Sequence, residues 1–333
     1  MSSFLGVDGG GTKTALCLVS SDGDVLATLG APSCYYLGPA SSAGVELVSA
    51  VLGEAVPAVC ARAGITPAEV DFAFFGLPAY GEVSADVPAL DAAPRAALGH
   101  QRYRCDNDMV CGWAGSLALQ DGINVISGTG SMAYGQHGDR RARGGGWGEL
   151  FGDEGSGYWV GIRGLQAFAQ MSDGRLPAGA LLGLLRDHLS LDADLDLVDV
   201  VLNRWRGGRR EIAALSRPVV QAAGRGDSVA QQVLADAATE LARLVEATRV
   251  RLGFEPEETV PVSYSGGMFS VPEVRDGFQQ RLSDGQGRFA LQEPRFAPAV
   301  GAALYAAQLA GAPLPRPAWA RLSENALWPA PGK

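Results

Sequence analysis

The first thirty residues alternate between apolar runs and short polar breaks, a pattern that predicts a β-meander. The run Ala15–Val19 is short and is bounded by turn-forming residues, as is typical of a strand. Ser21–Asp24 reads as a hairpin turn, and Val25–Leu29 resumes the apolar pattern. We therefore expect three consecutive strands, with a glycine-rich loop between the first two.

Helices and strands then alternate through the first half of the chain. The spacing of apolar residues predicts helices over 43–63, 84–98 and 109–119, and strands over 71–77 and 103–105. This alternation indicates α/β architecture.

The second half begins with the same order of elements. A strand, a Gly/Thr/Ser loop and a second strand span 123–136, as they do over 4–19, which indicates a weak internal duplication. Helices dominate 156–252. Beyond them we expect a strand, a helix, a strand and a helix at 260–264, 272–283, 289–292 and 298–309. The proline-rich residues 312–333 read as a tail.

Length and composition restrict the class of protein. The chain has 333 residues, a formal net charge of −9 and 47% hydrophobic residues, which fits two folded domains with a cleft between them. No basic stripe is present, which argues against nucleic acid or an anionic membrane as the main partner. No apolar run has the ~20 residues of a membrane helix, and the N-terminus lacks the basic start of a signal peptide. We expect a cytoplasmic protein.

The segment Asp8–Thr14, with the sequence DGGGTKT, is the first candidate site. Glycines let backbone N–H groups converge on an anion, and Thr hydroxyls add donors. The candidate phosphate ligands are Gly10, Gly11, Thr12, Lys13 and Thr14. The segment fits neither a P-loop nor a dinucleotide fingerprint, and a plain glycine-rich hairpin explains it about equally well. Asp8, at the strand end, is a candidate to hold Mg²⁺ through water.

Two later glycine segments also follow predicted strands. Ser127–Ser131 lies between two strands, and two such loops in corresponding positions could clamp a polyphosphate from both sides. Its candidate ligands are Gly128, Thr129, Gly130 and Ser131. Ser265–Gly267 is most simply a strand-to-helix turn, but Gly266 and Gly267 would also let a nucleotide base and ribose approach the backbone.

The sequence Asp106-Asn107-Asp108 stands at a strand end just before a helix. Asp and Asn are favoured helix N-caps, and capping is the simplest explanation. A carboxylate here could also accept the proton of an attacking hydroxyl, as phosphoryl transfer to an alcohol requires.

Trp147 lies in the run Gly144–Gly148, shortly before the acidic pair Asp153-Glu154. Acids at a helix start often only complement the helix dipole. A Trp flanked by glycines has few local side chains to pack against, however, and an indole face beside carboxylates suits a sugar. The segment is therefore a candidate sugar site.

Taken together and in this order, these segments resemble the BadF/BadG/BcrA/BcrD ATPase family, which includes the animal-type N-acetylglucosamine kinases. The resemblance covers nearly the whole chain. It rests on DGGGTKT at 8–14, SGTGS at 127–131, GGGWG at 144–148, GDEGSGYW at 152–159, SGG at 265–267 and APAVGAAL at 297–304. The GGGWG and GDEGSGYW pair is its most specific part.

The resemblance implies a two-domain ribonuclease-H-like fold of the actin/hexokinase/Hsp70 type, with a central nucleotide cleft. The domains would span 1–118 and 119–296, and a helix at 297–311 would pack back onto the first. The implied activity is that of an ATP-dependent amino-sugar kinase, most simply an N-acetylglucosamine kinase. ATP and Mg²⁺ would be its cofactors, and the family implies a homodimer.

The resemblance also assigns roles to residues. Asp108 matches the general base, and the two loops, through Thr12, Thr14, Thr129 and Gly130, match phosphate contacts. The candidate sugar-contacting residues are Ser33, Cys34, Asp108, Thr129, Trp147, Gly148 and Asp153.

One departure concerns the substrate. Where the family often has an Asn that hydrogen-bonds the sugar, this chain has Cys34, and a thiol is a poor substitute for an amide. Glucosamine or another hexosamine therefore stays open as the substrate. Two other roles stay open as well, a BadF-type ATPase that activates a partner enzyme and a non-catalytic sugar sensor.

Overall fold

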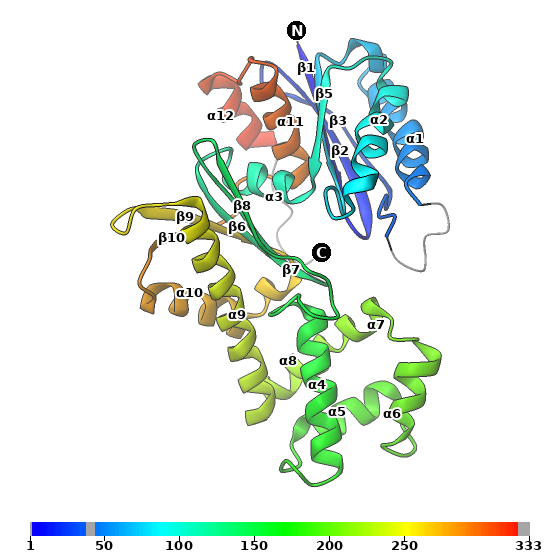
Figure 1. The fold of residues 1–333 in the computed structure, drawn as a ribbon, viewed down its shortest axis with the longest axis vertical. Helices are drawn as coiled ribbons and strands as arrows, with labels where there is room; N and C mark the ends of the chain where they lie inside the picture. The colour runs from blue at the N-terminus through cyan, green and yellow to red at the C-terminus, as the bar shows by residue number, and fades with distance from the viewer. Residues whose placement is uncertain (1, 38–43, 326–333) are drawn as a thin grey trace. The chain divides into compact units, whose positions relative to one another are not determined.

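The computed structural model of the chain describes residues 2–37 and 44–325, which form two compact units. Unit 1 comprises residues up to Gln120 together with those from Glu293 onward, and unit 2 comprises Asp121–Gln292. Each unit contains one five-stranded sheet with helices packed on it (Figure 1). Among the helices described, none is both long and apolar enough to cross a lipid bilayer.

Unit 1 is built on a sheet with the strand order β3-β2-β1-β4-β5. Its strands are β1 (Ser3–Gly9), β2 (Lys13–Ser20), β3 (Val25–Pro32), β4 (Phe72–Leu77) and β5 (Tyr103–Asn107). The first three are antiparallel neighbours, which confirms the predicted meander, whereas β4 and β5 continue parallel to β1. Because parallel strands end at the same edge of a sheet, the loop after β1 and the residues after β5 share one edge.

Helices cover both faces of this sheet (Figure 1). They are α1 (Glu46–Arg62), α2 (Val87–Leu98), α3 (Met109–Ser116) and α11 (Pro298–Leu309), with the short 3₁₀ turns η1 (Pro67–Glu69) and η2 (Ser84–Asp86). On one face, Val48 of α1 and Leu90 of α2 share a buried core with Leu5 and Val7 of β1. The four predicted helices are confirmed, although the first was predicted to begin at residue 43, which lies outside the described residues, and the third ends earlier, at Ser116.

The opposite face of the sheet carries α11 and α3. Phe74 of β4 meets Tyr305 of α11 edge to face, with ring centroids 4.9 Å apart. Gly6 of β1 makes the close approach possible, because a Cβ there would clash with the carbonyl oxygen of Ala299. The last part of the chain therefore completes the core around its first strand.

The predicted tail is partly wrong. Residues Arg316–Asn325 form helix α12, in which Ala318 and Leu322 are buried because their spacing of four places them on one helical face. Leu314, just before the helix, is also buried. The prolines that suggested a tail stand at the start of this helix, where a missing N–H costs nothing. Residues 326–333 of that segment lie outside the described residues.

Unit 2 repeats the strand order of unit 1. Its strands are β6 (Gly122–Ser127), β7 (Ser131–His137), β8 (Arg140–Gly145), β9 (Thr259–Ser265) and β10 (Arg288–Gln292). The order β10-β9-β6-β7-β8 again places an antiparallel meander beside two parallel strands. The duplication indicated by the sequence therefore extends to all five strands. Strand β8 was not expected, because its sequence RRARGG has no apolar alternation.

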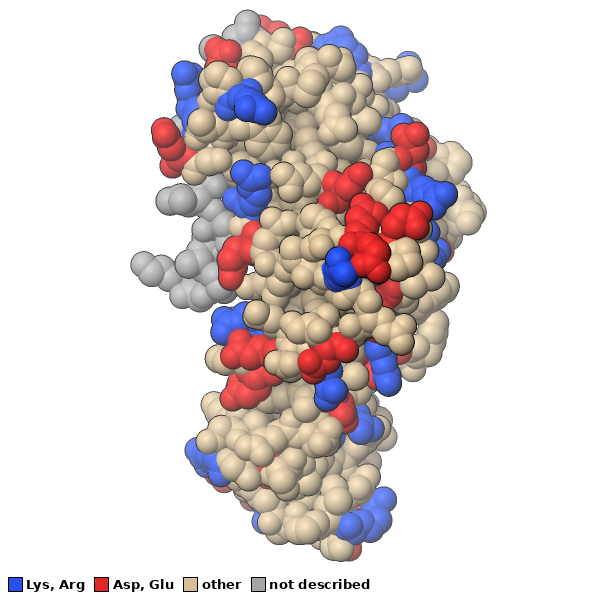
Figure 2. Space-filling model, turned by 90° about the vertical axis from the view of Figure 1, so that its left-hand side faces the viewer, with Lys and Arg blue, Asp and Glu red and all other residues tan. Residues whose placement is uncertain are grey.

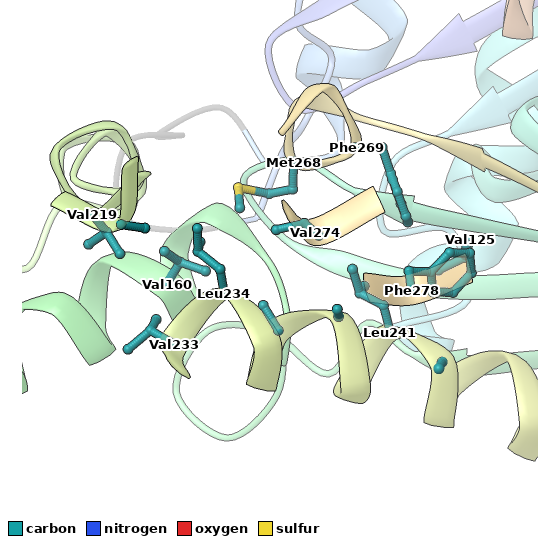
Figure 3. Close-up of a cluster of buried hydrophobic side chains, with 14 of the residues drawn as sticks. Val125, Val160, Val219, Val233, Leu234, Leu241, Met268, Phe269, Val274 and Phe278 are labelled. Atoms are coloured by element: carbon teal, nitrogen blue, oxygen red, sulfur yellow. The ribbon is translucent and has the colours of Figure 1, made fainter. Parts of the chain in front are cut away.

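The helices of unit 2 are concentrated between β8 and β9. They are α4 (Gly157–Ser172), α5 (Ala180–Leu189), α6 (Asp196–Asp199), the π-helical turn η3 (Val200–Arg204), α7 (Arg209–Ala214), α8 (Ser216–Gly224) and α9 (Ser228–Leu252), with η4 (Gly267–Ser270) and α10 (Pro272–Asp284) after β9. In Figure 3, Leu234 and Leu241 of the long helix α9 lie in one buried cluster with Val160 of α4 and Phe278 of α10. This core anchors the helices to the sheet.

Candidate functional site

The first glycine loop connects β1 to β2. Gly10 N donates to the Lys13 carbonyl at 2.9 Å, which closes the turn. Gly11, Thr12 and Lys13 are exposed, and a Cβ on Gly11 would meet nothing within 4 Å. Thr14, by contrast, is fully buried and its hydroxyl donates to the Pro32 carbonyl at 2.9 Å. The structure thus presents the loop tip to solvent and directs Thr14 into the protein.

Ser33 and Cys34 lie beside this loop. The Ser33 hydroxyl donates to the Gly10 carbonyl at 2.9 Å and accepts from Tyr35 N at 3.1 Å. Cys34 is fully buried, and burial raises the pKa of its thiol to about 11. Cys34 is therefore placed in the wall of the loop, with its side chain turned away from solvent.

Two carboxylates lie near each other below the loop, Asp8 at the end of β1 and Asp108 after β5. The strand between them carries Gly76, which pairs with Asp8, and a Cβ on Gly76 would lie 3.0 Å from Asp108 Cα. Burial and, after it, the charge of Asp108 raise the pKa of Asp8 to about 7, and Lys13 opposes that shift. Two half-buried acids at such close range form a site that favours a cation or a proton.

The sequence left open whether Asp108 is only a helix cap. It occupies the N-cap position of α3, but its side chain makes no capping hydrogen bond. Asn107 instead accepts from Met109 N at 3.2 Å through its Oδ1 atom. Because the neighbouring amide caps the helix, capping does not account for an acid at position 108.

The second glycine loop, Gly128–Gly130, connects β6 to β7. Gly128 N donates to the Gly130 carbonyl at 2.9 Å. Two donors at the start of α4 hold the loop from outside: Gly157 N donates to the Gly128 carbonyl at 2.8 Å, and Tyr158 N to the Thr129 carbonyl at 3.2 Å. Thr129 itself is exposed. The loop is thus a fixed backbone turn with its central residue at the surface.

The third glycine segment lies directly against the second. β9 pairs with β6 up to Ser265, opposite Ile126. Gly266 then has a φ of +99°, and a Cβ there would lie 2.8 Å from Gly128 N and clash with the Ser127 carbonyl. The structure therefore brings Gly266 and Gly267 together with the Gly128–Gly130 loop.

Asp153 lies beneath the same loop. Its Oδ1 accepts from Ser131 N at 3.2 Å, and its Oδ2 accepts from Arg209 Nη2 at 2.6 Å. Burial raises the pKa of this carboxyl, and the Arg209 guanidinium opposes that shift. In this conformation the carboxylate faces protein groups and is almost fully buried.

Trp147 belongs to a connection whose apolar side chains are turned outward. Trp147 is 72% exposed, and Leu150 and Phe151 in the same segment are similarly exposed. Gly148 has a φ of +89°, which only glycine adopts readily. An exposed cluster of large apolar side chains marks a ligand or interaction surface.

Arg209 was not found by the sequence analysis. It pairs with Asp153 across 56 residues and also lies 3.5 Å from Glu149 through its Nε. It stands at the start of α7, and no local pattern distinguishes it from the neighbouring arginines. Only the fold reveals its position.

The predicted residues thus fall into two groups. Unit 1 carries Asp8, the Gly10–Thr14 loop, Ser33, Cys34 and Asp108, and unit 2 carries the Gly128–Ser131 loop, Trp147, Gly148, Asp153 and the pair Gly266-Gly267.

Within the described residues, no three His, Cys, Asp or Glu side chains form a metal cluster. Lys and Arg are interspersed with Asp and Glu on the face shown in Figure 2.

Known proteins resemble this chain along most of its length. A kinase from Clostridium acetobutylicum named for N-acetylmuramic acid and N-acetylglucosamine is 32% identical over 85% of this chain and 91% of its own. An N-acetyl-D-glucosamine kinase from Dictyostelium discoideum is 28% identical over 91% and 97%. A solved structure from Chromobacterium violaceum, described as a candidate N-acetylglucosamine kinase, is 27% identical with a TM-score of 0.69 and covers 91% of this chain and 98% of its own.

These comparisons confirm the fold class and the family predicted from the sequence. The two α/β units with matching sheets agree with the actin/hexokinase-type architecture expected. The sequence profile of the BadF/BadG/BcrA/BcrD ATPase family matches residues 5–306, and the chain belongs to this family.

Proposed function

We propose that this protein is an ATP-dependent amino-sugar kinase, which transfers the γ-phosphoryl group of ATP to a hydroxyl of N-acetylglucosamine or a closely related amino sugar. The names of its relatives support this assignment. The observation that carries it is the acid at position 108, which stands at a helix start that Asn107 already caps. A carboxylate in this position suits a general base.

In the proposed reaction, Asp108 accepts the proton of the sugar hydroxyl while that oxygen attacks the phosphorus. The exposed Gly10–Lys13 loop and the Gly128–Gly130 loop bind the phosphates through backbone N–H groups and the Thr12 and Thr129 hydroxyls. Gly266 and Gly267 lie beside the nucleotide. Thr14 contributes from within, where its hydroxyl fixes the strand that follows the loop.

Mg²⁺ fits the acidic pair of unit 1. Burial, followed by the charge of the neighbouring Asp108, raises the pKa of Asp8 to about 7, and a divalent cation would offset both effects. We assign Asp8 to hold the ion through water, as Mg²⁺ commonly retains several waters. The ion would neutralise charge on the phosphates during transfer.

The sugar is assigned to the exposed Trp147-Gly148 segment, to Ser33 and to Asp108. Trp147 offers an apolar face for the sugar ring, and Ser33 is held beside the first loop by its hydrogen bond to the Gly10 carbonyl. Cys34 contributes an apolar wall, consistent with its burial. Because ATP is supplied inside cells, we place the reaction in the cytoplasm.

We also propose that the protein is a homodimer, joined through an apolar stripe on α6 and η3. Leu195, Val198 and Leu202 recur at helical spacing and are all exposed. The exposed Asp192 precedes the stripe, and the exposed Arg204 follows it. Two copies related by a two-fold axis would therefore set the acidic end of one stripe against the basic end of the other.

Light scattering tests the dimer. Leu202→Glu is expected to give a monomer, whereas Val250→Glu, at an exposed apolar residue of α9, should leave the dimer intact. A monomeric wild-type protein, or a dimer that survives Leu202→Glu, would contradict this surface.

The kinase is tested by ADP release from Mg-ATP across a panel of sugars. The panel contains N-acetylglucosamine, N-acetylmuramic acid, glucosamine, N-acetylmannosamine, N-acetylgalactosamine and glucose. Turnover that depends on one of the amino sugars, with a matching sugar phosphate in the products, is the expected result. Slow ATP hydrolysis that no sugar changes would contradict the kinase and favour a partner-activating ATPase.

A further inference from the structure

We propose that Arg209 is a positioning residue for the reaction. It acts through Asp153 to hold the Gly128–Ser131 loop in the shape that binds phosphate. This inference rests on the proposed function, because it assumes that the loop binds the phosphates of ATP. Arg209 has no part in the sequence motifs of the family resemblance.

The contacts place Arg209 and Asp153 directly beneath the loop. Arg209 Nη2 donates to Asp153 Oδ2 at 2.6 Å, and Ser131 N donates to Asp153 Oδ1 at 3.2 Å. A Cβ on Gly130 would lie 2.8 Å from Asp153 Oδ2 and would clash with Arg209 Nη2. The carboxylate and the guanidinium therefore fill the space under the glycine, and the backbone of Gly130 rests on them.

Asp153 could not keep this position alone. Its φ is +59°, a conformation that costs a non-glycine residue free energy unless its surroundings hold it there. Its side chain is only 3% exposed, and a buried carboxylate without a partner is strongly disfavoured. The Arg209 charge offsets the free-energy cost of burying the Asp153 carboxylate. The strained backbone of Asp153 and the loop above it therefore depend on the arginine.

Arg209 also contacts the segment assigned to the sugar. Its Nε lies 3.5 Å from Glu149 Oε2, two residues beyond Trp147. The same guanidinium therefore touches the support of the phosphate loop and the connection that carries the indole. Within unit 2, it links the two parts of the site.

Helix α7, which begins at Arg209, is itself fixed to the helix that holds the other side of the loop. A Cβ on Gly161 of α4 would clash with the Ile212 carbonyl of α7, so the two helices are in close contact. The first turn of α4 donates Gly157 N and Tyr158 N to loop carbonyls. The loop is thus supported from both sides by one packed helix pair.

The test compares four variants: Arg209→Ala, Asp153→Asn, the double variant and Arg210→Ala. Arg210 is the exposed neighbour on α7 and serves as the matched control. Binding of a non-hydrolysable ATP analogue with Mg²⁺ is measured by calorimetry, together with kcat, KM and melting temperature. Arg209→Ala is expected to weaken analogue binding by about tenfold or more, the usual cost of a lost charged hydrogen bond, with Arg210→Ala within about twofold of wild type.

The double variant separates a positioning role from direct contact with substrate. If Arg209 acts through Asp153, the double variant binds the analogue no worse than Arg209→Ala. Losses that multiply would show that Arg209 reaches the nucleotide by another route and would overturn the proposal. So would wild-type binding and kinetics in Arg209→Ala with only a lowered melting temperature.

One further variant and the choice of a binding assay keep the result interpretable. Arg209→Lys retains the charge and is expected to recover part of the binding, so it replaces Arg209→Ala if that variant does not fold. Analogue binding does not require turnover. A wild-type protein inert toward every sugar would contradict the kinase, while the binding series would still test Arg209.

Discussion

The two units have the same sheet but support their glycine loops differently. In unit 1, the loop after β1 lies over two acids, Asp8 and Asp108, whose charges raise each other's free energy. In unit 2, the loop after β6 lies over Asp153, whose charge is matched by Arg209 at 2.6 Å. The same strand order thus supplies one loop with two neighbouring acids and the other with an acid–arginine ion pair.

The connections between strands explain this difference. The meander of unit 1 returns to its fourth strand through residues 33–71, which supply α1 and η1. The meander of unit 2 returns through residues 146–258, which supply six α-helices, including α7 with its arginine. Duplicated sheets therefore fix where the loops lie, whereas the connections decide their charge and chemistry.

The largest effect is expected when an acid of unit 1 is replaced, and replacing the acid of unit 2 should act on a different step. Asp108→Asn is expected to lower kcat by ~10³-fold, within the range for loss of a general base, with ATP binding retained. Asp153→Asn should act mainly on ATP affinity, because its carboxylate is turned toward protein groups. The kinetic constants of both variants check this division.

Asp106→Asn is the control, since Asp106 stands on the same strand end and its Oδ1 accepts from Asn107 N. An equal loss of kcat in Asp106→Asn would remove Asp108 from its assigned role. An equal loss in Asp153→Asn would abolish the distinction between the units.

A second prediction concerns the close approach of backbones in unit 2. Gly266→Ala is expected to destabilise the protein by about 2 kcal/mol, because Gly266 has a φ of +99° and its new Cβ would clash with the Ser127 carbonyl. Urea unfolding measures the effect. Gly267→Ala, where a Cβ would meet nothing within 4 Å, should change stability much less. Equal midpoints for the two variants would contradict the packing of the second and third glycine segments.

A third prediction tests the corresponding approach in unit 1. Gly76→Ala is expected to cost about 1–2 kcal/mol of stability and to lower kcat, because its Cβ would clash with Cys111 Sγ and press on Asp108. Cys111→Ala removes that sulfur, so the double variant should recover most of the stability lost. Urea unfolding of the pair checks this, and a double variant no more stable than Gly76→Ala would mean that the strain lies elsewhere.

The smallest expected effect lies in the helical connection of unit 2. Hydrogen bonds from Arg186 and Ser172 lower the pKa of Asp194 to about 2. A carboxylate with a lowered pKa stabilises the fold above its ordinary pKa, and this contribution is lost as the pH falls toward about 2. Asp194→Asn should therefore cost under about 1 kcal/mol at pH 7, since the pair is partly exposed. Unfolding at pH 7 and pH 3 should show the difference shrinking, and a difference that grows on acidification would contradict the assigned pairing.

The sequence predicted the features that depend on neighbouring residues. The meander, the glycine loops and most helices were found because apolar periodicity and turn residues act locally. Strand β8 was missed because its arginines and glycines hide the alternation, and α12 because its prolines suggested a tail. The burial of Thr14 follows from strand alternation beside the exposed Lys13, yet a motif alone cannot show it.

The site residues divide in the same way. Asp108 and the loops belong to contiguous motifs, so they could be nominated from the sequence. The pairing of Asp153 with Arg209 joins residues 56 positions apart, and it depends on how α7 packs against α4. No local pattern encodes such a contact. A buried ion pair of this kind becomes visible only when the chain is folded.

The seating of α11 on β1 has a consequence for how the protein is made. Gly6 packs against Ala299, so β1 lacks one of its covering helices until α11 has been synthesised. At typical elongation rates this interval is about 15–60 s. Unit 2 is continuous in sequence and can complete its core before unit 1 does. During translation, unit 1 therefore starts before unit 2 but finishes after it, and one apolar face of its sheet stays uncovered in the meantime.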